Sequence, residues 1–347
     1  MIYQWNKPLW HKLLGQAGRL PHALLLCGPA GGGKMDFARA LAARLLCETA
    51  SGEAEACGNC PSCKWFAAGN HPDFRLIEPG GDETGPEGEG GEVEPASQKK
   101  KSEQIRIDQV RALDDFLSIG THRQGARVII VHPAEAMNRA TANALLKMLE
   151  EPSASTLFIL ITNNRRKLLP TILSRCQTLN FPKSPPEQAL VWLRESSVPH
   201  AEELLSHAGG MPLMAVDEAA GWAHLEGFYR DLAQIEQAGP IVIAGRWEAQ
   251  LKESRDGAAS VDKAAFVLWM QKWVFDLISV KLCGAVVFHA HKLKEVRAAA
   301  ARASISALFD YYSDLLRIKA VAQHPLNPRL FLEDMLSRYA RAASSGR

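Results

Sequence analysis

The sequence lacks an apolar run that could act as a signal peptide or cross a bilayer. Residues 5–7, within Met1–Trp10, are Trp-Asn-Lys, where a secretory signal would have its apolar core. The longest apolar stretch, Ala264–Val287, is interrupted by charged residues, and two of them, Lys272 and Asp276, are four apart. We therefore expect an amphipathic helix in this stretch and a cytoplasmic protein that does not enter a membrane.

The sequence also lacks a strong excess of either charge. It has 40 Lys and Arg residues against 38 Asp and Glu residues, a formal net charge of +2 and a pI near 8.1. A dedicated nucleic-acid binder is usually far more basic. The charge balance therefore gives no argument for DNA contact by this chain alone. With 347 residues, the chain is long enough for two or three domains.

A glycine-rich loop follows a predicted strand at Ala23–Leu26. Gly28, Gly33 and Lys34 match the phosphate-loop pattern G-x-x-x-x-G-K-[ST]. These glycines, with Gly31 between them, let backbone N–H groups turn inward and form an anion nest at the start of the next helix. Lys34 would reach the outer phosphates of a nucleotide. The alternative is a glycine-rich turn that binds nothing.

The residues that would hold magnesium beside this loop are missing. The Ser or Thr of the pattern is replaced by Met35, whose thioether is a poor ligand for a hard cation. A second predicted strand, Val128–Val131, should end in an Asp-Glu pair in an ATPase of this type, but His132 and Pro133 follow it. Glu135 lies two residues beyond the catalytic position, and we expect it to face elsewhere. The sequence predicts weak nucleotide binding at most and no hydrolysis.

Four of the seven cysteines form a C-x9-C-x2-C-x2-C array. They are Cys47, Cys57, Cys60 and Cys63. Tight C-x2-C turns place thiolates at the corners of a small tetrahedron that suits zinc, and four cysteines leave no open coordination position. His71 could replace Cys47 as the fourth ligand, and free buried thiols are the alternative to any metal. We expect one structural zinc ion.

The stretch 126–176 predicts the centre of a parallel sheet. The strand ending at residue 131 is followed by a predicted helix, Asn143–Glu151, and by a second buried strand, Leu157–Ile161, which together form a parallel βαβ unit. Thr162 ends the second strand, where a polar residue usually senses the γ-phosphate. Arg175 could stabilise the charge of phosphoryl transfer in a neighbouring subunit, or form an ordinary surface salt bridge.

The rest of the chain divides by composition. Residues 79–102 are rich in Gly, Glu and Asp, and we interpret them as a disordered surface insertion. Short helices are predicted at Glu187–Ala208 and Pro212–Ala220. The pattern after Trp222 is helical throughout, and the last helix begins at Asn327-Pro328. Expected helices in this region are Trp222–Ala238, Val261–Leu282, Lys294–Ala322 and Pro328–Ala342.

The order of these motifs resembles the AAA+ clamp-loader family of bacterial DNA polymerase III, and within it the delta prime type. The resemblance covers nearly the whole chain. Its most specific parts are the four-cysteine module, Asn143–Pro152, Ser174–Cys176 and the ending Asn327–Asp334. It implies an α/β RecA-like AAA+ nucleotide domain at 1–181, a parallel sheet with flanking helices that carries the zinc module (47–63) and the insertion. A small helical lid at 182–220 and an all-α collar at 221–347 would follow.

The resemblance also implies the function. Motor subunits of the family carry a lid arginine where this chain has Leu213, a third loss that favours a non-hydrolysing subunit. Such a subunit completes the ring and offers Arg175 to ATP on an adjacent motor. The implied partners are the gamma/tau motor subunits, the delta subunit, the sliding clamp and primed DNA, within a DNA polymerase (nucleotidyltransferase) holoenzyme. The alternative is an ATP-hydrolysing motor; a small-molecule kinase fits poorly because no acceptor-site motif is present.

Overall fold

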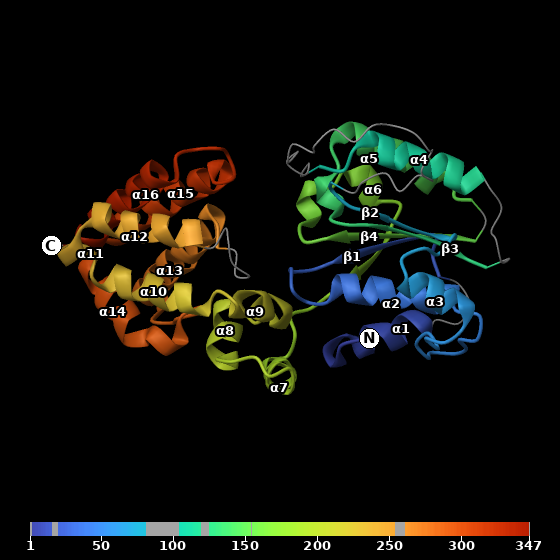
Figure 1. The fold of residues 1–347 in the computed structure, drawn as a ribbon, viewed down its shortest axis with the longest axis horizontal. Coiled ribbons are helices and arrows are strands. Elements are labelled where there is room, and N and C mark those ends of the chain that lie inside the picture. The colour runs from blue at the N-terminus through green and yellow to red at the C-terminus, as the bar shows by residue number, and fades with distance from the viewer. Residues whose placement is uncertain are drawn as a thin grey trace. The chain divides into compact units, whose positions relative to one another are not determined.

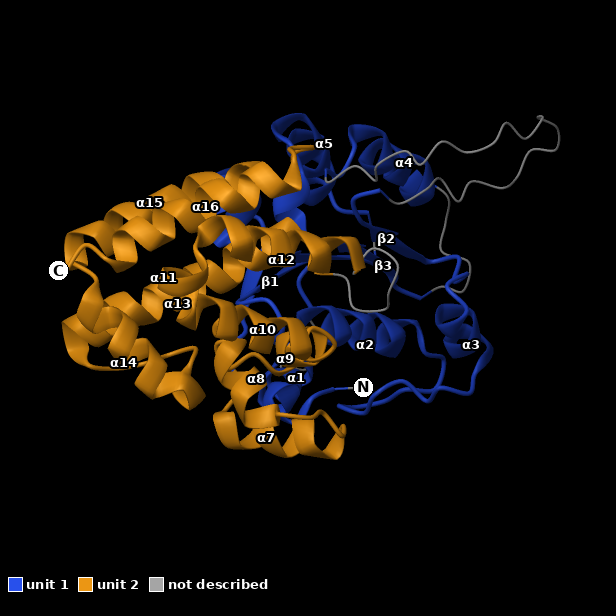
Figure 2. Ribbon diagram, turned by 60° about the vertical axis from the view of Figure 1, so that its left-hand side comes forward, with its two compact units in different colours: residues 1–183 blue, residues 184–347 orange. Residues whose placement is uncertain are grey.

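The computed structural model describes residues 2–15, 20–80, 104–118, 125–153, 155–253 and 261–346. These residues form two compact units, Met1–Lys183 and Ser184–Arg347, which are coloured separately in Figure 2. Most of the expected insertion at 79–102 lies outside the described residues. Each unit is described here by itself.

The first unit is built on a five-stranded parallel sheet. The strands are β1 (Ala23–Cys27), β2 (Phe74–Ile77), β3 (Arg127–Val131), β4 (Thr156–Thr162) and β5 (Gln177–Asn180), in the spatial order β2-β3-β4-β1-β5. Ala23 to Cys27 pair with residues 158–162, so the carboxyl ends of β1 and β4 lie side by side. In an open parallel sheet, ligands bind at this edge.

Helices cover both faces of this sheet (Figure 1). They are α1 (Lys7–Leu14), α2 (Lys34–Leu46) and α3 (Pro61–Ala67) on one side, and α4 (Ile107–Ser118), α5 (Arg139–Glu150) and α6 (Pro170–Leu173) on the other. The short 3₁₀ turns are η1 (Gln4–Asn6), η2 (Ala134–Ala136) and η3 (Arg165–Lys167). Successive strand residues alternate between two cores: Leu24 and Leu26 enter the core with α1 and α2, and Leu25 enters the core with α4 and α5.

The predicted βαβ unit is confirmed, because β3, α5 and β4 follow in order and β3 pairs with β4 in parallel. Its helix begins earlier than the predicted Asn143: the side chain of Asn138 accepts a hydrogen bond from Thr141 N at 2.9 Å and caps a helix that starts at Arg139. The edge strand β5 and the short helix α3 were not predicted from the sequence.

In the second unit, helices account for all the regular secondary structure of the described residues. They are α7 (Pro186–Glu195), α8 (Ala201–His207), α9 (Pro212–Ala219), α10 (Trp222–Ala233), α11 (Ile235–Ala238), α12 (Pro240–Glu253), α13 (Lys263–Cys283), the 3₁₀ turn η4 (Ala290–Lys292), α14 (Leu293–Arg302), α15 (Ile305–Val321) and α16 (Pro328–Ala343). Two cores form: a small one within α7–α9, and a large one over α10–α16.

Two long helices expected from the sequence are interrupted. The stretch Lys294–Ala322 breaks at Ser304, whose side chain accepts a hydrogen bond from Ala307 N and starts a new helix. The stretch Trp222–Ala238 divides at Gln234. The helix α12 was not among the expected helices. The predicted helix cap at Asn327 is confirmed, because its side chain accepts a hydrogen bond from Arg329 N at 2.9 Å.

The two charged residues Lys272 and Asp276 in the middle of α13 are buried, which corrects the amphipathic interpretation. Asp276 is fully buried, and its carboxylate accepts hydrogen bonds from the backbone of residues 287–289 and from His289 Nδ1 at 2.7 Å. Lys272 is 7 % exposed and donates to Glu218 Oε1 of α9 at 2.7 Å. Each buried charge has a partner, which is the condition under which a buried charge is tolerated.

None of the helices in the described ranges is both long enough and apolar enough to span a bilayer.

Candidate functional site

The glycine-rich loop joins β1 to α2 at the carboxyl edge of the sheet. Gly33 has φ = 85°, a left-handed conformation that favours glycine, and it is the residue before the first turn of α2. Gly31 also has a positive φ, of 75°. A Cβ atom at Gly28 would lie 2.5 Å from Phe181 O, so this position has no room for a side chain. The predicted phosphate-loop geometry is therefore present.

The side chain of Lys34 is folded back onto this loop. Its Nζ donates to Gly28 O at 2.9 Å and to Pro29 O at 2.5 Å. Burial lowers its pKa to about 8, against the opposing attraction of Cys27 and Glu135. The ammonium group of Lys34 is therefore satisfied by carbonyl oxygens of its own loop.

The N-terminal segment covers the loop, which sequence reasoning did not foresee. Trp5 Nε1 and Asn6 Nδ2 both donate to Gly32 O, at 3.1 and 2.9 Å. The ring of Tyr3 lies 2.5 Å from the position of a Cβ atom at Gly33 and stacks on Trp5. No motif in residues 3–6 predicts these contacts, which arise only when the chain folds. They restrict the outer side of the loop.

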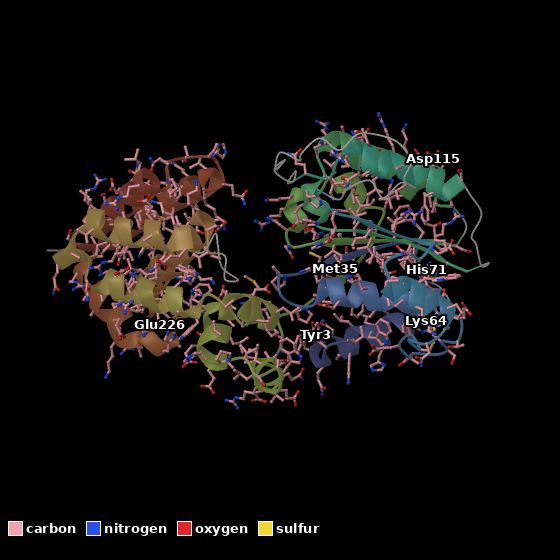
Figure 3. All side chains as sticks on the ribbon, viewed as in Figure 1. Tyr3, Met35, Lys64, His71, Asp115 and Glu226 are labelled. Carbon is pink, nitrogen blue, oxygen red and sulfur yellow. The ribbon has the colours of Figure 1, made fainter. Side chains whose placement is uncertain are left out.

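The magnesium side of the site has no ligand of the expected type. Met35, labelled in Figure 3, is the second residue of α2. Its side chain packs against the apolar core that contains Leu24, and its thioether offers no oxygen. His132, at the end of β3, pairs with Glu78 Oε1 at 3.4 Å. Glu135 does not face away as expected: its Oε1 accepts a hydrogen bond from Asn163 N at 3.0 Å, at the end of β4.

Thr162 lies where the sequence placed it, at the end of β4 and beside the loop. Its backbone oxygen accepts a hydrogen bond from Gly28 N at 3.4 Å, and its hydroxyl accepts one from Asn164 N at 3.0 Å. The structure thus brings together Gly28, Lys34 and Thr162, and adds the carboxylate of Glu135. This arrangement offers polar groups for an anion but no magnesium site of the usual kind.

The four cysteines form a compact cluster. All four sulfur atoms lie within 4.8 Å of one another. Cys47 Sγ is 4.0 Å from Cys60 Sγ, and Cys57 Sγ is 3.9 Å from Cys63 Sγ. A tetrahedron with metal–sulfur bonds of about 2.3 Å has edges of about 3.8 Å, so the spacing fits a tetrahedral metal ion.

The backbone around these sulfurs is also arranged for thiolates. Backbone N–H groups of Cys57, Cys60 and Cys63 each point at a sulfur of the cluster at 3.4 Å. His71, which is labelled in Figure 3, is not in the cluster. Its Nδ1 accepts a hydrogen bond from Asp73 N and its Nε2 contacts Ser62 Oγ at 2.7 Å. The alternative of His71 as fourth ligand is therefore not supported.

Arg175 follows α6 on an ordered turn and is held there. Its Nη2 lies 2.5 Å from Glu150 Oε1, at the end of α5, and its Nη1 donates to Thr171 O at 3.0 Å. The side chain remains 33 % exposed. The adjacent Cys176 is buried in the same core as residues of α5, so it anchors the turn. This burial also raises the pKa of its thiol to about 11. Sequence reasoning offered the salt bridge and the trans role as alternatives, and the salt bridge is present in this chain.

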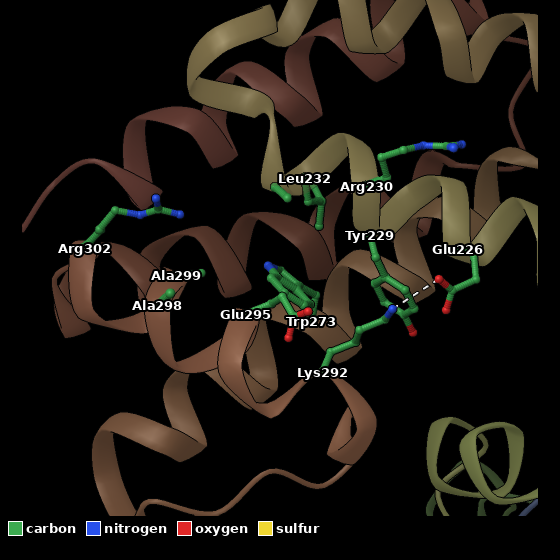
Figure 4. A pocket seen from close by; sticks show the side chains of 11 residues that line it. Glu226, Tyr229, Arg230, Leu232, Trp273, Lys292, Glu295, Ala298, Ala299 and Arg302 are labelled. Carbon is green, nitrogen blue, oxygen red and sulfur yellow. Dashed lines mark hydrogen bonds and ion pairs between the residues drawn. The ribbon is translucent and has the colours of Figure 1, made fainter.

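Leu213 lies in the first turn of α9 and is partly buried. A separate cavity of about 350 Å³ lies among α10, α13 and α14 of the second unit. Tyr229 and Trp273 line it, and Lys292 Nζ pairs with Glu226 Oε2 at 3.1 Å at one side of it (Figure 4). None of the predicted site residues lines this cavity.

Comparison with known proteins places the first unit in a family. A family model described as "DNA polymerase III, delta subunit" matches residues 8–185, just over half of the chain. DNA polymerase III subunit delta' of Pseudomonas aeruginosa is 41 % identical over 218 residues, 62 % of this chain and 60 % of that protein. The match therefore spans less than two thirds of this relative's length.

Two further relatives distinguish the subunit types. DNA polymerase III subunit delta' of Bacillus subtilis is 34 % identical over 251 residues, 70 % of this chain and 69 % of that protein. DNA polymerase III subunit tau of Salmonella typhimurium is 36 % identical over 159 residues, 46 % of this chain and 21 % of that protein. The family match and the similarity to the delta' subunits agree, and this chain belongs to the DNA polymerase III, delta subunit family.

Proposed function

We propose that this chain is the delta prime-type subunit of a DNA polymerase III clamp loader. In this role it completes a ring with gamma/tau motor subunits and a delta subunit, and the ring loads the sliding clamp on primed DNA during replication. The observation that carries the proposal is a formed phosphate loop without magnesium ligands in a chain of this family. Met35 packs against the core and His132 pairs with Glu78, so neither of these two positions offers an oxygen ligand for magnesium beside Lys34.

The phosphate loop is then a degenerate nucleotide site. Gly28, Gly31, Gly33, Lys34 and Thr162 keep the shape of the site, but Lys34 is satisfied by carbonyl oxygens of its own loop. A nucleotide would have to displace these contacts without magnesium to bridge its phosphates. We infer weak binding at most and no hydrolysis.

The catalytic contribution of the subunit is made in trans through Arg175. Its guanidinium lies on a turn anchored by the buried Cys176 and is partly exposed to solvent. A planar guanidinium can grip phosphate oxygens through two parallel hydrogen bonds. We infer that Arg175 reaches the terminal phosphate of ATP bound to an adjacent motor subunit.

We further propose that the cysteine cluster holds one zinc ion and that the chain has three domains. Cys47, Cys57, Cys60 and Cys63 supply four thiolates and no open position, which suits a structural site. The separate cores of α7–α9 and α10–α16 support a lid at 182–220 and a collar at 221–347 after the AAA+ domain at 1–181.

Reconstitution tests the proposal. We expect motor and delta subunits of the same organism to show DNA-stimulated ATP turnover and clamp loading only when this chain is added. The variant Lys34→Ala should leave both activities unchanged. If the isolated chain turns over ATP and Lys34→Ala abolishes this activity, the chain is itself a motor subunit and the proposal is wrong.

A further inference from the structure

We propose that Glu150 is a positioning residue for Arg175. It holds the guanidinium while the chain is alone and competes with the nucleotide phosphate for it in the assembled ring. This inference rests on the proposed trans role of Arg175. The consequence is that Glu150 sets the ATP concentration at which the neighbouring motor site becomes active.

Both terminal nitrogens of the guanidinium are engaged within this chain. Nη2 lies 2.5 Å from Glu150 Oε1, whereas Nη1 donates to Thr171 O at 3.0 Å and to Ser174 Oγ at 3.3 Å. Nη1 carries two hydrogens and already has two acceptors, so a phosphate gripped by two parallel hydrogen bonds would use Nη2 and Nε. Nη2 is also the nitrogen that Glu150 contacts, so a phosphate there would lie next to the carboxylate and compete with it for Arg175.

Glu150 is the contact that can yield. The oxygen of Thr171 belongs to the backbone of α6 and cannot turn away without unwinding that helix. The carboxylate of Glu150 is at the end of a rotatable side chain that is 49 % exposed. A carboxylate and a phosphate both bind the N–H edge of a guanidinium with the same geometry, so the two anions compete for Nη2.

The location of Glu150 explains why it is a holding group rather than a permanent partner. It is the last residue of α5, where the helix dipole presents partial negative charge. A carboxylate there is unfavourable by itself, and the positive charge of Arg175 offsets this. A half-exposed ion pair is weak in water, so a phosphate with more negative charge can displace Glu150 once a neighbouring subunit delivers it.

The chain offers a matched control in the next residue. Glu151 is exposed, and within the described ranges it takes part in no ion pair or side-chain hydrogen bond. Glu150→Gln and Glu151→Gln therefore remove the same charge from neighbouring positions. Glutamine at residue 150 keeps the shape and one acceptor oxygen but no longer competes as an anion.

The test is ATP turnover by the reconstituted ring with primed DNA, measured as a function of ATP concentration. We expect Glu150→Gln to lower the ATP concentration for half-maximal turnover about twofold to fivefold at the site facing this chain, because exposed ion pairs are weak. Turnover at saturating ATP should stay unchanged. The turnover of that site is obtained by subtracting the turnover of rings with Arg175→Ala from the turnover of rings that retain Arg175.

Ionic strength gives a second measurement that a purely structural role would not affect. Because salt screens exposed charges, the difference between Glu150→Gln and the wild-type chain should shrink between 50 and 500 mM salt, over which the Debye length falls from roughly 14 to 4 Å. Glu151→Gln should match the wild-type chain at every salt concentration.

The outcomes separate this inference from the proposed function. If Arg175→Ala reduces turnover while Glu150→Gln equals Glu151→Gln, the inference is wrong and the trans role stands. If Glu150→Gln raises the half-maximal ATP concentration or lowers saturating turnover, Glu150 supports the action of Arg175 and does not compete with phosphate, and the inference is wrong. If Arg175→Ala changes nothing, both the inference and the trans role of Arg175 fail.

Discussion

At the scale of single residues, the nucleotide site keeps its shape and lacks its cation ligands. Gly33 retains the left-handed backbone that a phosphate loop needs, yet Met35 packs against the core and offers no oxygen. The ammonium group of Lys34 donates hydrogen bonds to the backbone oxygens of Gly28 and Pro29. Water can replace one missing magnesium ligand. Here both expected protein ligands, the hydroxyl at residue 35 and the carboxylates after β3, are absent from their positions.

The purified chain should therefore not hydrolyse ATP above background, with or without DNA. Phosphate-release assays at millimolar ATP and magnesium check this. The variant Lys34→Ala serves as the control, because background from a contaminating enzyme does not depend on it. Turnover that Lys34→Ala removes would contradict the account.

The cysteine cluster predicts a metal content. Because the four sulfur atoms already have tetrahedral spacing, the reduced protein should contain about one zinc ion per chain with zinc–sulfur distances of about 2.3 Å. Elemental analysis and X-ray absorption measure these two quantities. Cys60→Ser should lose most of the zinc and unfold the segment 47–63 at lower temperature.

Cys283→Ser is the matched control for this prediction. Cys283 is exposed and lies outside the cluster, so its substitution should leave zinc content and melting temperature unchanged. Reduced protein purified without chelators and found free of metal would show that the cluster is four thiols.

At the scale of secondary-structure elements, α13 is joined to α9 and to the loop before η4 by buried charges. Asp276 accepts three backbone hydrogen bonds and one from His289. Lys272 and His207 both donate to Glu218. These contacts join α8 and α9 of the small core to α13 of the large core. The two cores therefore share one buried polar junction.

Substitution of Asp276 should test this junction. Asp276→Asn replaces an acceptor oxygen by a donor facing buried N–H groups, and we expect a loss of about 3–5 kcal/mol in the free energy of unfolding. Asp310→Asn, on the exposed surface of α15, should change it by less than about 0.5 kcal/mol. Denaturant unfolding measures both, and equal values for the two variants would contradict the buried role.

The same junction predicts a dependence on pH. Burial lowers the pKa of His207 from 6.5 to about 4, against the favourable contact with Glu218 and with further lowering by Lys272 and His289. The unfolded chain therefore binds more protons than the folded chain between these values. Stability should fall as the pH is lowered from 6.5 to 4.

His207→Asn keeps a donor toward Glu218 and removes the titration. It should reduce the slope of the unfolding free energy in that pH range by up to about 1.4 kcal/mol per pH unit. His289 titrates in the same direction, so some slope remains. An unchanged slope would mean that His207 is not protonated on unfolding.

The sequence predicted those elements whose signals are local. The three predicted strands, the phosphate loop, the cysteine array and the Asn327 cap all follow from short stretches of sequence. The partners of Asp276, Arg175 and Glu135 lie on other elements, and no local pattern predicts such pairings. The break at Ser304 was missed because the apolar helical periodicity continues across it.

At the scale of the whole molecule, the proposed subunit combines a nucleotide site that does not hydrolyse ATP with an arginine that acts on a neighbouring subunit. A subunit without its own hydrolysis can still contribute to the reaction of a ring if it completes the site of a neighbour. In the proposed division into an AAA+ domain, a lid and a collar, assembly rests mainly on the collar after Trp222. Substitutions in the turn at residues 174–176 should therefore leave assembly intact.

Arg175→Lys should restore little of the activity lost in Arg175→Ala, because a lysine ammonium lacks the planar fork that grips two phosphate oxygens. Comparison of both variants in clamp loading on primed DNA checks this. Full activity with lysine would show that only the charge of the side chain matters.

The most direct test of the account is the activity of rings that contain Arg175→Ala. A finger arginine contributes roughly 10³–10⁵ in rate at the site it serves, and only one site of the ring would face this subunit. We predict normal assembly by size-exclusion chromatography, with reduced DNA-stimulated ATP turnover and clamp loading under limiting ATP. If the variant assembles normally and loads clamps at the wild-type rate, Arg175 is only a surface ion-pair partner of Glu150 and the central claim is wrong.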